Sequence, residues 1–299
     1  MPMAQIGTLD FKGFIENRKE ARPGGAESGG HAYAYVSDQS SREAFEKMKP
    51  VKLAVSAAVR FFRAIGKSEL LGQGVKVGPN QFPRVHNIAA ECASTLGIAV
   101  PTLYIVNNPT MNAATYGTND DSFIMIHSAL VDQFTDEELR SVIGHECGHI
   151  HNEHVVFLTA MYFLTIAAST ILGPFIKPAE LALASWSRRA EITCDRAGLL
   201  CCKNLDVSTR TFARLALGSM KLYSELNLEA FLDQYEEGKD GSGRYSELGK
   251  SHPYLPKRVL ALREFAKSEL YLKHIGQAAP GLPMKEVDEK VHEIIRIFS

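Results

Sequence analysis

One segment near the middle of the chain constrains the fold more than any other, because it predicts a helix and also which side chains lie on each face of that helix. Thr135-Asp136-Glu137-Glu138 has the form of a capping box, in which the threonine hydroxyl and the last glutamate each bond a backbone amide of the first turn. We therefore expect a helix that begins near Asp136. Its apolar residues recur at helical spacing and would face the core: Leu139, Val142, Ile143, Cys147 and Ile150.

The same predicted helix carries His145-Glu146-Cys147-Gly148-His149. Two histidines four residues apart project from one helical face, so both imidazoles can reach one metal ion while Glu146 lies near them. A hydrolytic zinc ion takes three protein ligands and keeps one position open for water. The pattern therefore indicates a site that activates water, and this site needs a third ligand from elsewhere.

Donor residues close to the motif fit the third ligand position poorly. At about 100° per residue, His151 and His154 lie far around the helix from the paired histidines, and Cys147 points away from them. Glu153 lies on nearly the same face as the pair, but it is too far along the helix axis to close the site. We therefore expect the third ligand to come from another segment.

A better candidate lies downstream, in the segment Ser187-Arg188-Arg189-Ala190-Glu191-Ile192-Thr193-Cys194-Asp195. On a predicted helix its two carboxylates lie four residues apart, so Glu191 can bind zinc while Asp195 orients a ligand histidine. The pairing of this segment with the histidine motif resembles the M48 metallopeptidases, the gluzincin group that includes the HtpX and Ste24 proteases. The resemblance implies that Glu191 is the third ligand and that Asp195 is the aspartate of the family motif. Cys194 stands where the family usually has alanine.

Three further segments extend the resemblance, which covers the chain from roughly Leu70 to Ala266. They look like the family's asparagine-containing segment, its substrate-flanking edge strand and its His-Pro segment, and they lie at residues 112–117, 122–126 and 251–258. In the family, such segments hold the substrate backbone or the oxyanion of the reaction. The resemblance therefore implies substrate-binding or catalytic roles for Asn112, Ile124, Met125, His252 and Arg258.

Together the motifs predict a zinc hydrolase, and the resemblance implies a zinc-dependent metalloendopeptidase with one zinc ion per chain that acts on polypeptides in protein quality control. Zinc lowers the pKa of its water and polarises the scissile carbonyl, so Glu146 can take the water's proton and pass it to the leaving amine. We expect His252 to donate to the oxyanion, with Arg258 orienting His252 or a nearby acid.

Two other functions stay open. One is a noncatalytic polypeptide-binding or chaperone-like module in which zinc is structural, and the other is a zinc hydrolase of non-peptide amides. The intact Glu146 argues against the first, because a structural zinc site has no use for a general base. The expected edge strand at residues 122–126 could pair with an extended peptide, which argues against the second.

The remaining pattern predicts a zincin-like α+β fold, mostly helical, in which a small sheet packs against the histidine helix. Short strands are expected at residues 102–106, 113–116 and 122–127. We expect an N-terminal extension at residues 1–45, with a flexible glycine-rich loop at 21–30, followed by a zinc peptidase domain at 46–299. Further helices are expected at residues 46–65, 82–96, 208–226, 228–236, 256–273 and 284–298.

The 22 residues from Val155 to Ile176 carry no charge and are long enough to span a membrane. A single crossing would separate Glu191 from the histidines, because the return stretch at 178–187 is too short to cross back. We therefore expect a hydrophobic helical hairpin that turns at Gly173-Pro174. Peripheral membrane contact stays open for this stretch and for residues 49–67, a basic amphipathic segment that could equally pack as an ordinary core helix.

Composition separates this chain from several other classes of protein. Its 299 residues, 45% hydrophobic and 22% charged, can bury a substantial core. The net charge of −1 and the lack of a basic run give no indication of nucleic-acid binding. Residues 1–20 lack the apolar region of a signal peptide, so we expect a cytoplasmic location and reduced thiols at the five cysteines.

Overall fold

The computed structural model describes residues 31–45, 53, 55–57, 59–60, 67–119, 121–168, 173–238 and 250–297. The chain divides into two compact units, Met1–His31 and Ala32–Ser299, and the second is described below. This unit includes α2 (Val36–Phe45), which the sequence analysis assigns to the N-terminal extension and which packs against α9 (Gly173–Cys202). The predicted loop at 21–30 and most of the predicted basic helix at 46–65 lie outside the described residues.

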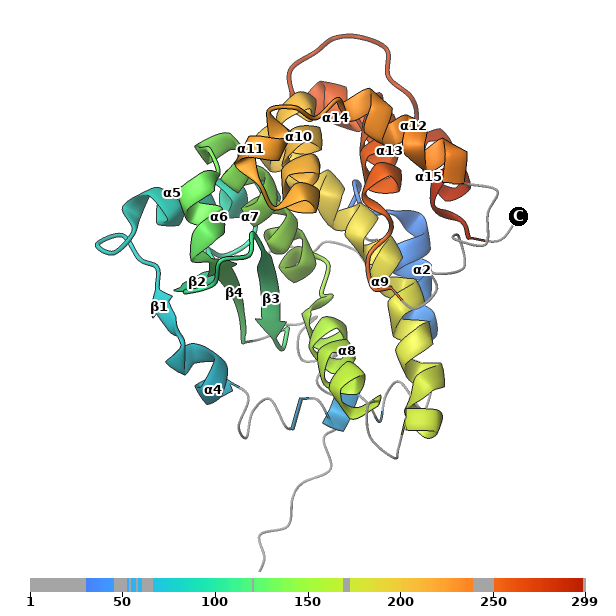
Figure 1. The fold of residues 1–299 in the computed structure, drawn as a ribbon. Helices are drawn as coiled ribbons and strands as arrows, with labels where there is room; N and C mark the ends of the chain where they lie inside the picture. Colours follow the sequence, from blue (N-terminus) through green and yellow to red (C-terminus); the bar gives the residue numbers. More distant parts are fainter. Residues whose placement is uncertain are drawn as a thin grey trace, which may run out of the picture. The chain divides into compact units, whose positions relative to one another are not determined.

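Four short strands form one sheet among the described residues, in the order β1-β2-β4-β3 (Figure 1). β2 runs parallel to β4, whereas β1 pairs antiparallel with β2, and β3 pairs antiparallel with β4. The three predicted strands are confirmed, but β1 is not predicted, because three residues are too few to show an alternating pattern. The strands are β1 (Gly74–Lys76), β2 (Thr102–Val106), β3 (Ala113–Gly117) and β4 (Ser122–His127).

The histidine motif lies on α7 (Asp136–His151), which begins where the capping box predicts. The Thr135 hydroxyl accepts the Glu138 amide, and the Glu138 carboxylate accepts the Thr135 amide at 2.9 Å. α7 packs against α5 (Pro83–Leu96), α9 and β3, and its apolar stripe is buried except at Ile150, which is partly buried. The predicted α+β fold, mostly helical with a small sheet beside the histidine helix, is confirmed.

The apolar stretch after α7 forms α8 (Val155–Ala168) and the start of α9, and these two helices pack against each other. The predicted turn at Gly173-Pro174 is wrong, because both residues belong to the first turn of α9. A proline is tolerated there, since the first amides of a helix have no partner within it. Among the described residues, we find no helix that is both long enough and apolar enough to cross a membrane.

The C-terminal part is helical, as predicted, but it contains more breaks. The helix expected at 208–226 ends early, because Gly218 adopts a left-handed conformation with φ 62° and caps α10. The helix expected at 256–273 is split, because Ser268 caps a new helix and accepts the amide of Tyr271. The helices of this part are α10 (Leu205–Leu217), α11 (Met220–Tyr223), α12 (Leu228–Gly238), α13 (Leu255–Phe265), α14 (Glu269–His274) and α15 (Met284–Ile295).

One fully buried arginine ties both ends of this unit to α9. The guanidinium of Arg196 lies 5.5 Å from the centre of the Tyr35 ring and 5.2 Å from that of Phe265. It donates to the Tyr33 carbonyl at 3.1 Å and to the Asp288 carboxylate at 2.7 Å. The segment before α2, the end of α13 and the start of α15 therefore meet on one turn of α9.

Candidate metal centre

Two glycines let α7 and α9 approach closely enough for their side chains to converge. A Cβ at Gly148 would lie 2.8 Å from the Ala197 Cβ and 3.1 Å from the Cys194 Cα. A Cβ at Gly198 would lie 2.6 Å from the Ser141 carbonyl oxygen. Since nonbonded carbons ordinarily stay about 3.5–4.0 Å apart, a larger residue would force the helices apart. The histidine-bearing face of α7 is thus held against the carboxylates of α9.

His145, His149 and Glu191 lie together and offer three potential metal ligands. The Nε2 atom of His145 lies 3.5 Å from Oε2 of Glu191, and Nε2 of His149 lies 3.4 Å from Oε1. Two ligands at about 2.1 Å from zinc, at a tetrahedral angle, are about 3.4 Å apart, so these spacings fit a zinc ion. The buried Oε2 atom of Glu191 accepts no hydrogen bond from any described residue, as expected of an oxygen that serves a metal.

Positively charged and imidazole groups surround the Glu191 carboxylate. Nδ1 of His252 lies 2.8 Å and Nη2 of Arg258 lies 3.2 Å from Oε2 of Glu191, although neither approach has hydrogen-bond geometry. Burial alone raises the pKa of Glu191, but His252, Arg258 and His145 outweigh it and hold the pKa well below its ordinary value. Glu191 is therefore ionised at neutral pH, as a carboxylate ligand must be.

Asp195 and Arg258 support this arrangement from behind His145. Oδ1 of Asp195 lies 2.9 Å from Nδ1 of His145, so the imidazole can donate there and keep Nε2 directed at Glu191. Arg258 donates to both oxygens of Asp195, at 2.8 and 2.6 Å. Burial tends to lower the pKa of His145, but Glu191 and Asp195 outweigh it and raise that pKa. Of the two roles expected for Arg258, these contacts match the orientation of nearby acids.

Glu146 and His252, the two side chains expected to take part in catalysis, lie in different environments. The Glu146 side chain is buried, and its Oε2 atom accepts the hydroxyl of Thr115 on β3 at 2.6 Å. Thr115 is a site residue that the sequence analysis missed, and its only signal is its place in the asparagine-containing segment. His252 precedes α13 and keeps 60% of its side chain exposed, so it reaches Glu191 from the solvent side.

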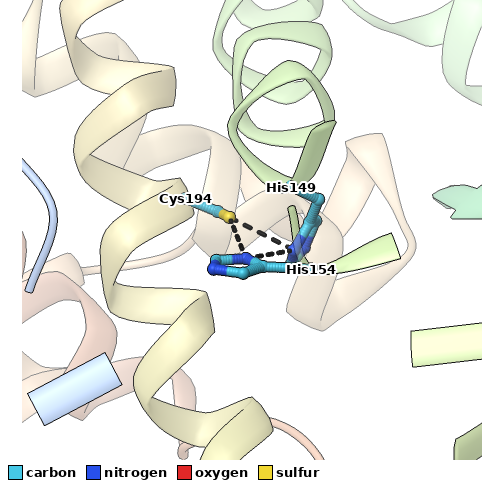
Figure 2. A group of neighbouring side chains, drawn as sticks. All are labelled: His149, His154 and Cys194. Carbon is cyan, nitrogen blue, oxygen red and sulfur yellow. Dashed lines mark hydrogen bonds between the residues drawn. The ribbon is translucent and has the colours of Figure 1, made fainter. Parts of the chain in front are cut away.

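A second group of side chains contacts His149 on its other face (Figure 2). The Nδ1 atom of His149 lies 3.2 Å from Nδ1 of His154 and 3.2 Å from Sγ of Cys194. The prediction that His154 lies far around the helix from His149 is wrong, because α7 ends at His151 and Glu153 turns the chain with φ 61°. His154 is therefore buried against His149.

The predicted substrate strand lies elsewhere than expected. β4, with Ile124 and Met125, is paired on one side with β2 and on the other with β3, so it offers no open edge to a peptide. The assignment of residues 122–126 as an edge strand is therefore wrong, and Ile124 is fully buried. The edge next to α7 is β3. Asn112, which directly precedes β3, is exposed, and its carbonyl accepts the His127 amide at 3.0 Å.

A helix that carries two histidines and a glutamate, facing a helix that offers a third ligand, is typical of zinc-dependent peptidases. Residues 79–266 match the model of peptidase family M48, and the chain belongs to this family. The matched segment includes α7 and the described turns of α9 that carry Glu191 and Asp195, but it excludes α2 and α15.

Several curated proteins are similar to this chain. A plastoglobule-localized metallopeptidase 48 of Arabidopsis thaliana is 34% identical over 224 residues, which cover 70% of this chain and 64% of the relative. The protease HtpX of Vibrio vulnificus is 27% identical over 210 residues, 58% of this chain and 69% of the relative. A protease HtpX homolog of Moorella thermoacetica is 28% identical over 127 residues, 42% of each chain. The chain thus spans less than two thirds of the plant relative, and no solved structure matches it.

Proposed function

We propose that this chain is a zinc-dependent endopeptidase that hydrolyses peptide bonds in polypeptides, with one zinc ion held by His145, His149 and Glu191. The observation that supports it most directly is the spacing of the three donors, 3.4 and 3.5 Å across the Glu191 carboxylate. The ionised state of Glu191 and its oxygen without a hydrogen bond are further support. Membership of a peptidase family agrees with this chemistry.

When bound, zinc would supply an activated water and a Lewis acid for the scissile carbonyl. Glu146 takes a proton from the attacking water and delivers it to the leaving amine. Because the Thr115 hydroxyl holds Oε2 of Glu146, Oε1 is the oxygen that receives the proton. Asp195 keeps His145 oriented, and Arg258 keeps Asp195 in place. The exposed His252 would donate to the developing oxyanion, with Glu191 serving as a metal ligand.

The substrate in this proposal is an extended segment of an unfolded polypeptide. β3 has one strand partner among the described residues and lies beside α7. Its last residue, Gly117, is hydrogen-bonded to Thr159 of α8, so a peptide can add as a further strand beside residues 113–115. Asn112 would meet that peptide at the start of β3. Unfolded chains present such segments along much of their length, and this is why we include a role in protein quality control. The expected peripheral membrane contact through 49–67 or 155–176 rests on the sequence alone.

The test uses the full chain, loaded with zinc and incubated with unfolded casein, whose fragments are sequenced by mass spectrometry. We expect Glu146→Gln to keep one zinc ion per chain and to lose hydrolysis by at least about 100-fold, the usual worth of a general base. Glu137→Gln, at an exposed position of the same helix, is the matched control and should cleave normally. Wild-type turnover by zinc-loaded Glu146→Gln would contradict the assignment. A zinc-loaded wild-type chain that leaves casein intact would favour a noncatalytic module.

A further inference from the structure

His149 is connected to the N-terminal part of the chain through a line of buried side chains. Its Nδ1 atom lies 3.2 Å from Nδ1 of His154. The other nitrogen of His154, Nε2, lies 3.1 Å from Oδ2 of Asp38 on α2. None of these three side chains is more than 4% exposed. Asp38 lies well before residue 79, where the match to the peptidase family begins.

Asp38 is itself held by two further donors from α9. The indole nitrogen of Trp186 donates to Oδ1 at 2.9 Å, and the hydroxyl of Thr193 donates to Oδ2 at 2.7 Å. The backbone amide of Tyr35 donates in turn to the Thr193 hydroxyl at 3.1 Å. Each oxygen of Asp38 therefore has a defined donor, and the carboxylate can only accept.

The order of donors along this line determines which ring nitrogens carry protons. Since the Asp38 carboxylate only accepts, Nε2 of His154 must donate to it, and a neutral His154 then has a bare Nδ1. That Nδ1 can only accept, so Nδ1 of His149 must be the donor. A neutral His149 with its proton on Nδ1 presents a lone pair at Nε2, the atom that lies 3.4 Å from Glu191.

We propose that Asp38 and His154 are positioning residues for His149, whose hydrogen bonds hold its imidazole in the tautomer that leaves Nε2 available to a metal ion. This inference rests on the proposed function, because it takes His149 Nε2 to be a ligand atom. It assigns to α2, outside the family-matching segment, a part in building the metal centre. Asp195 serves His145 in the same way, so each histidine has its own carboxylate, one direct and one through a second imidazole.

The same cluster could be interpreted as a second metal site, since His149, His154 and Cys194 bring three donors together. That site would need the lone pair of Nδ1 on His149, while the metal centre needs the one on Nε2, and a neutral imidazole has only one. In the hydrogen-bonded arrangement Nδ1 of His149 donates a proton and Nε2 keeps its lone pair for the metal, so we favour this arrangement. Metal binding at Cys194 is one of the outcomes of the test.

The most informative variant is Asp38→Asn, because the neighbouring side chains determine which way the oxygen and the NH2 group of the new amide point. The Trp186 indole can only donate, whereas the Thr193 hydroxyl can turn and accept. The amide oxygen must therefore face Trp186, and the amide NH2 must face Thr193 and His154. Nε2 of His154 then accepts, its Nδ1 carries the proton, and His149 is driven into the opposite tautomer. We expect the zinc dissociation constant to rise by about 10–100-fold, as for other groups that orient metal ligands, in competition with a chelator of known affinity.

Two controls separate this effect from loss of charge and from looser docking of α2. Asp206→Asn removes an exposed carboxylate whose one ion-pair partner among the described residues is Arg210 in α10, and it should bind zinc as the wild type does. Asp288→Asn weakens the contacts of Asp288 with Arg196 and with the amide of Val36, the first residue of α2, without touching His154. A loss of zinc affinity in Asp288→Asn as large as that in Asp38→Asn would overturn the proposal.

A second measurement reads the tautomers directly in the full chain labelled with 15N-histidine, using two-bond 1H–15N correlation after zinc removal. We expect the proton on Nδ1 of His149 and on Nε2 of His154 in the wild type, and the reverse in Asp38→Asn. A wild-type His149 protonated on Nε2 overturns the proposal even if Asp38→Asn does not fold. A second zinc ion that is lost in Cys194→Ala would establish the alternative metal site and overturn it as well. If the wild type binds no zinc, the proposed function fails, while the tautomers still decide this inference.

Discussion

Replacing Gly148 by alanine is the sharpest test of how the two ligand-bearing helices are brought together. The new methyl group would lie 2.8 Å from the Ala197 Cβ and 3.1 Å from the Cys194 Cα. Because carbon atoms normally stay about 3.8 Å apart, α9 must move away from α7 by about 1 Å. Glu191 is carried on α9, so its carboxylate would move relative to His145 and His149 by a similar amount.

The expected losses of unfolding free energy and of turnover distinguish an effect on the site from an effect on the fold. Overpacking of this kind costs about 1–3 kcal/mol, while alanine favours a helix over glycine by about 1 kcal/mol, so the net loss of unfolding free energy is about 0–2 kcal/mol. A displacement of about 1 Å in a catalytic group lowers turnover by about 100-fold. We therefore expect Gly148→Ala to remain folded and to lose most of its peptidase activity and zinc affinity.

The assay combines urea unfolding of the zinc-free chain with casein cleavage at saturating zinc and with zinc affinity measured by chelator competition. Gly72→Ala is the matched control, because a Cβ at Gly72 meets no atom within 4 Å. A folded Gly148→Ala variant with wild-type turnover and wild-type zinc affinity would refute the argument that close helix packing sets the ligand geometry. A loss of stability well above the expected range would instead mean that the whole interface fails.

Two further predictions concern the charges around Glu191. Arg258→Met leaves the buried carboxylates of Asp195 and Glu191 without their guanidinium, so we expect the unfolding free energy of the zinc-free chain to fall by about 3–5 kcal/mol; an unchanged urea midpoint would contradict this. The pKa of Glu191 in the folded chain lies well below its ordinary value of 4.5, so its contribution to stability is present above pH 4.5 and is lost as the pH falls toward the lower value. Acid unfolding followed by circular dichroism should be less steep in zinc-free Glu191→Gln than in the wild type, and parallel curves would rule out this contribution.

The sequence predicts the elements whose signals are local. The capping box at Thr135 places the start of α7 correctly, and Gly97, with φ 68°, ends α5 as expected of a left-handed cap. Histidines four residues apart on α7 and carboxylates four apart on α9 share faces because the helical period alone determines it. Glu191 therefore lies beside both histidines, as the motif and the resemblance together predict.

The features that the sequence does not predict depend on contacts between distant segments. The position of β4 inside the sheet follows from its pairing with β2, which no local pattern of residues 122–127 reveals. The placement of His154 fails because a left-handed residue, Glu153, ends the helical period that the angular argument assumes. Asp38 reaches His154 from α2, a segment with no recognisable motif.

The buried Arg196 also bears on when the proposed site can assemble as the chain is synthesised. Its partners lie far from it along the chain, with Tyr33 163 residues before it and Asp288 92 residues after it. Such distant contacts form late, because a long loop must close first. Until Asp288 has left the ribosome, α9 carries a cation without its carboxylate partner, and burying an unpaired charge is strongly unfavourable. The helix that bears Glu191 therefore reaches its final position only after the segment around Asp288 has been made, so the proposed site assembles late.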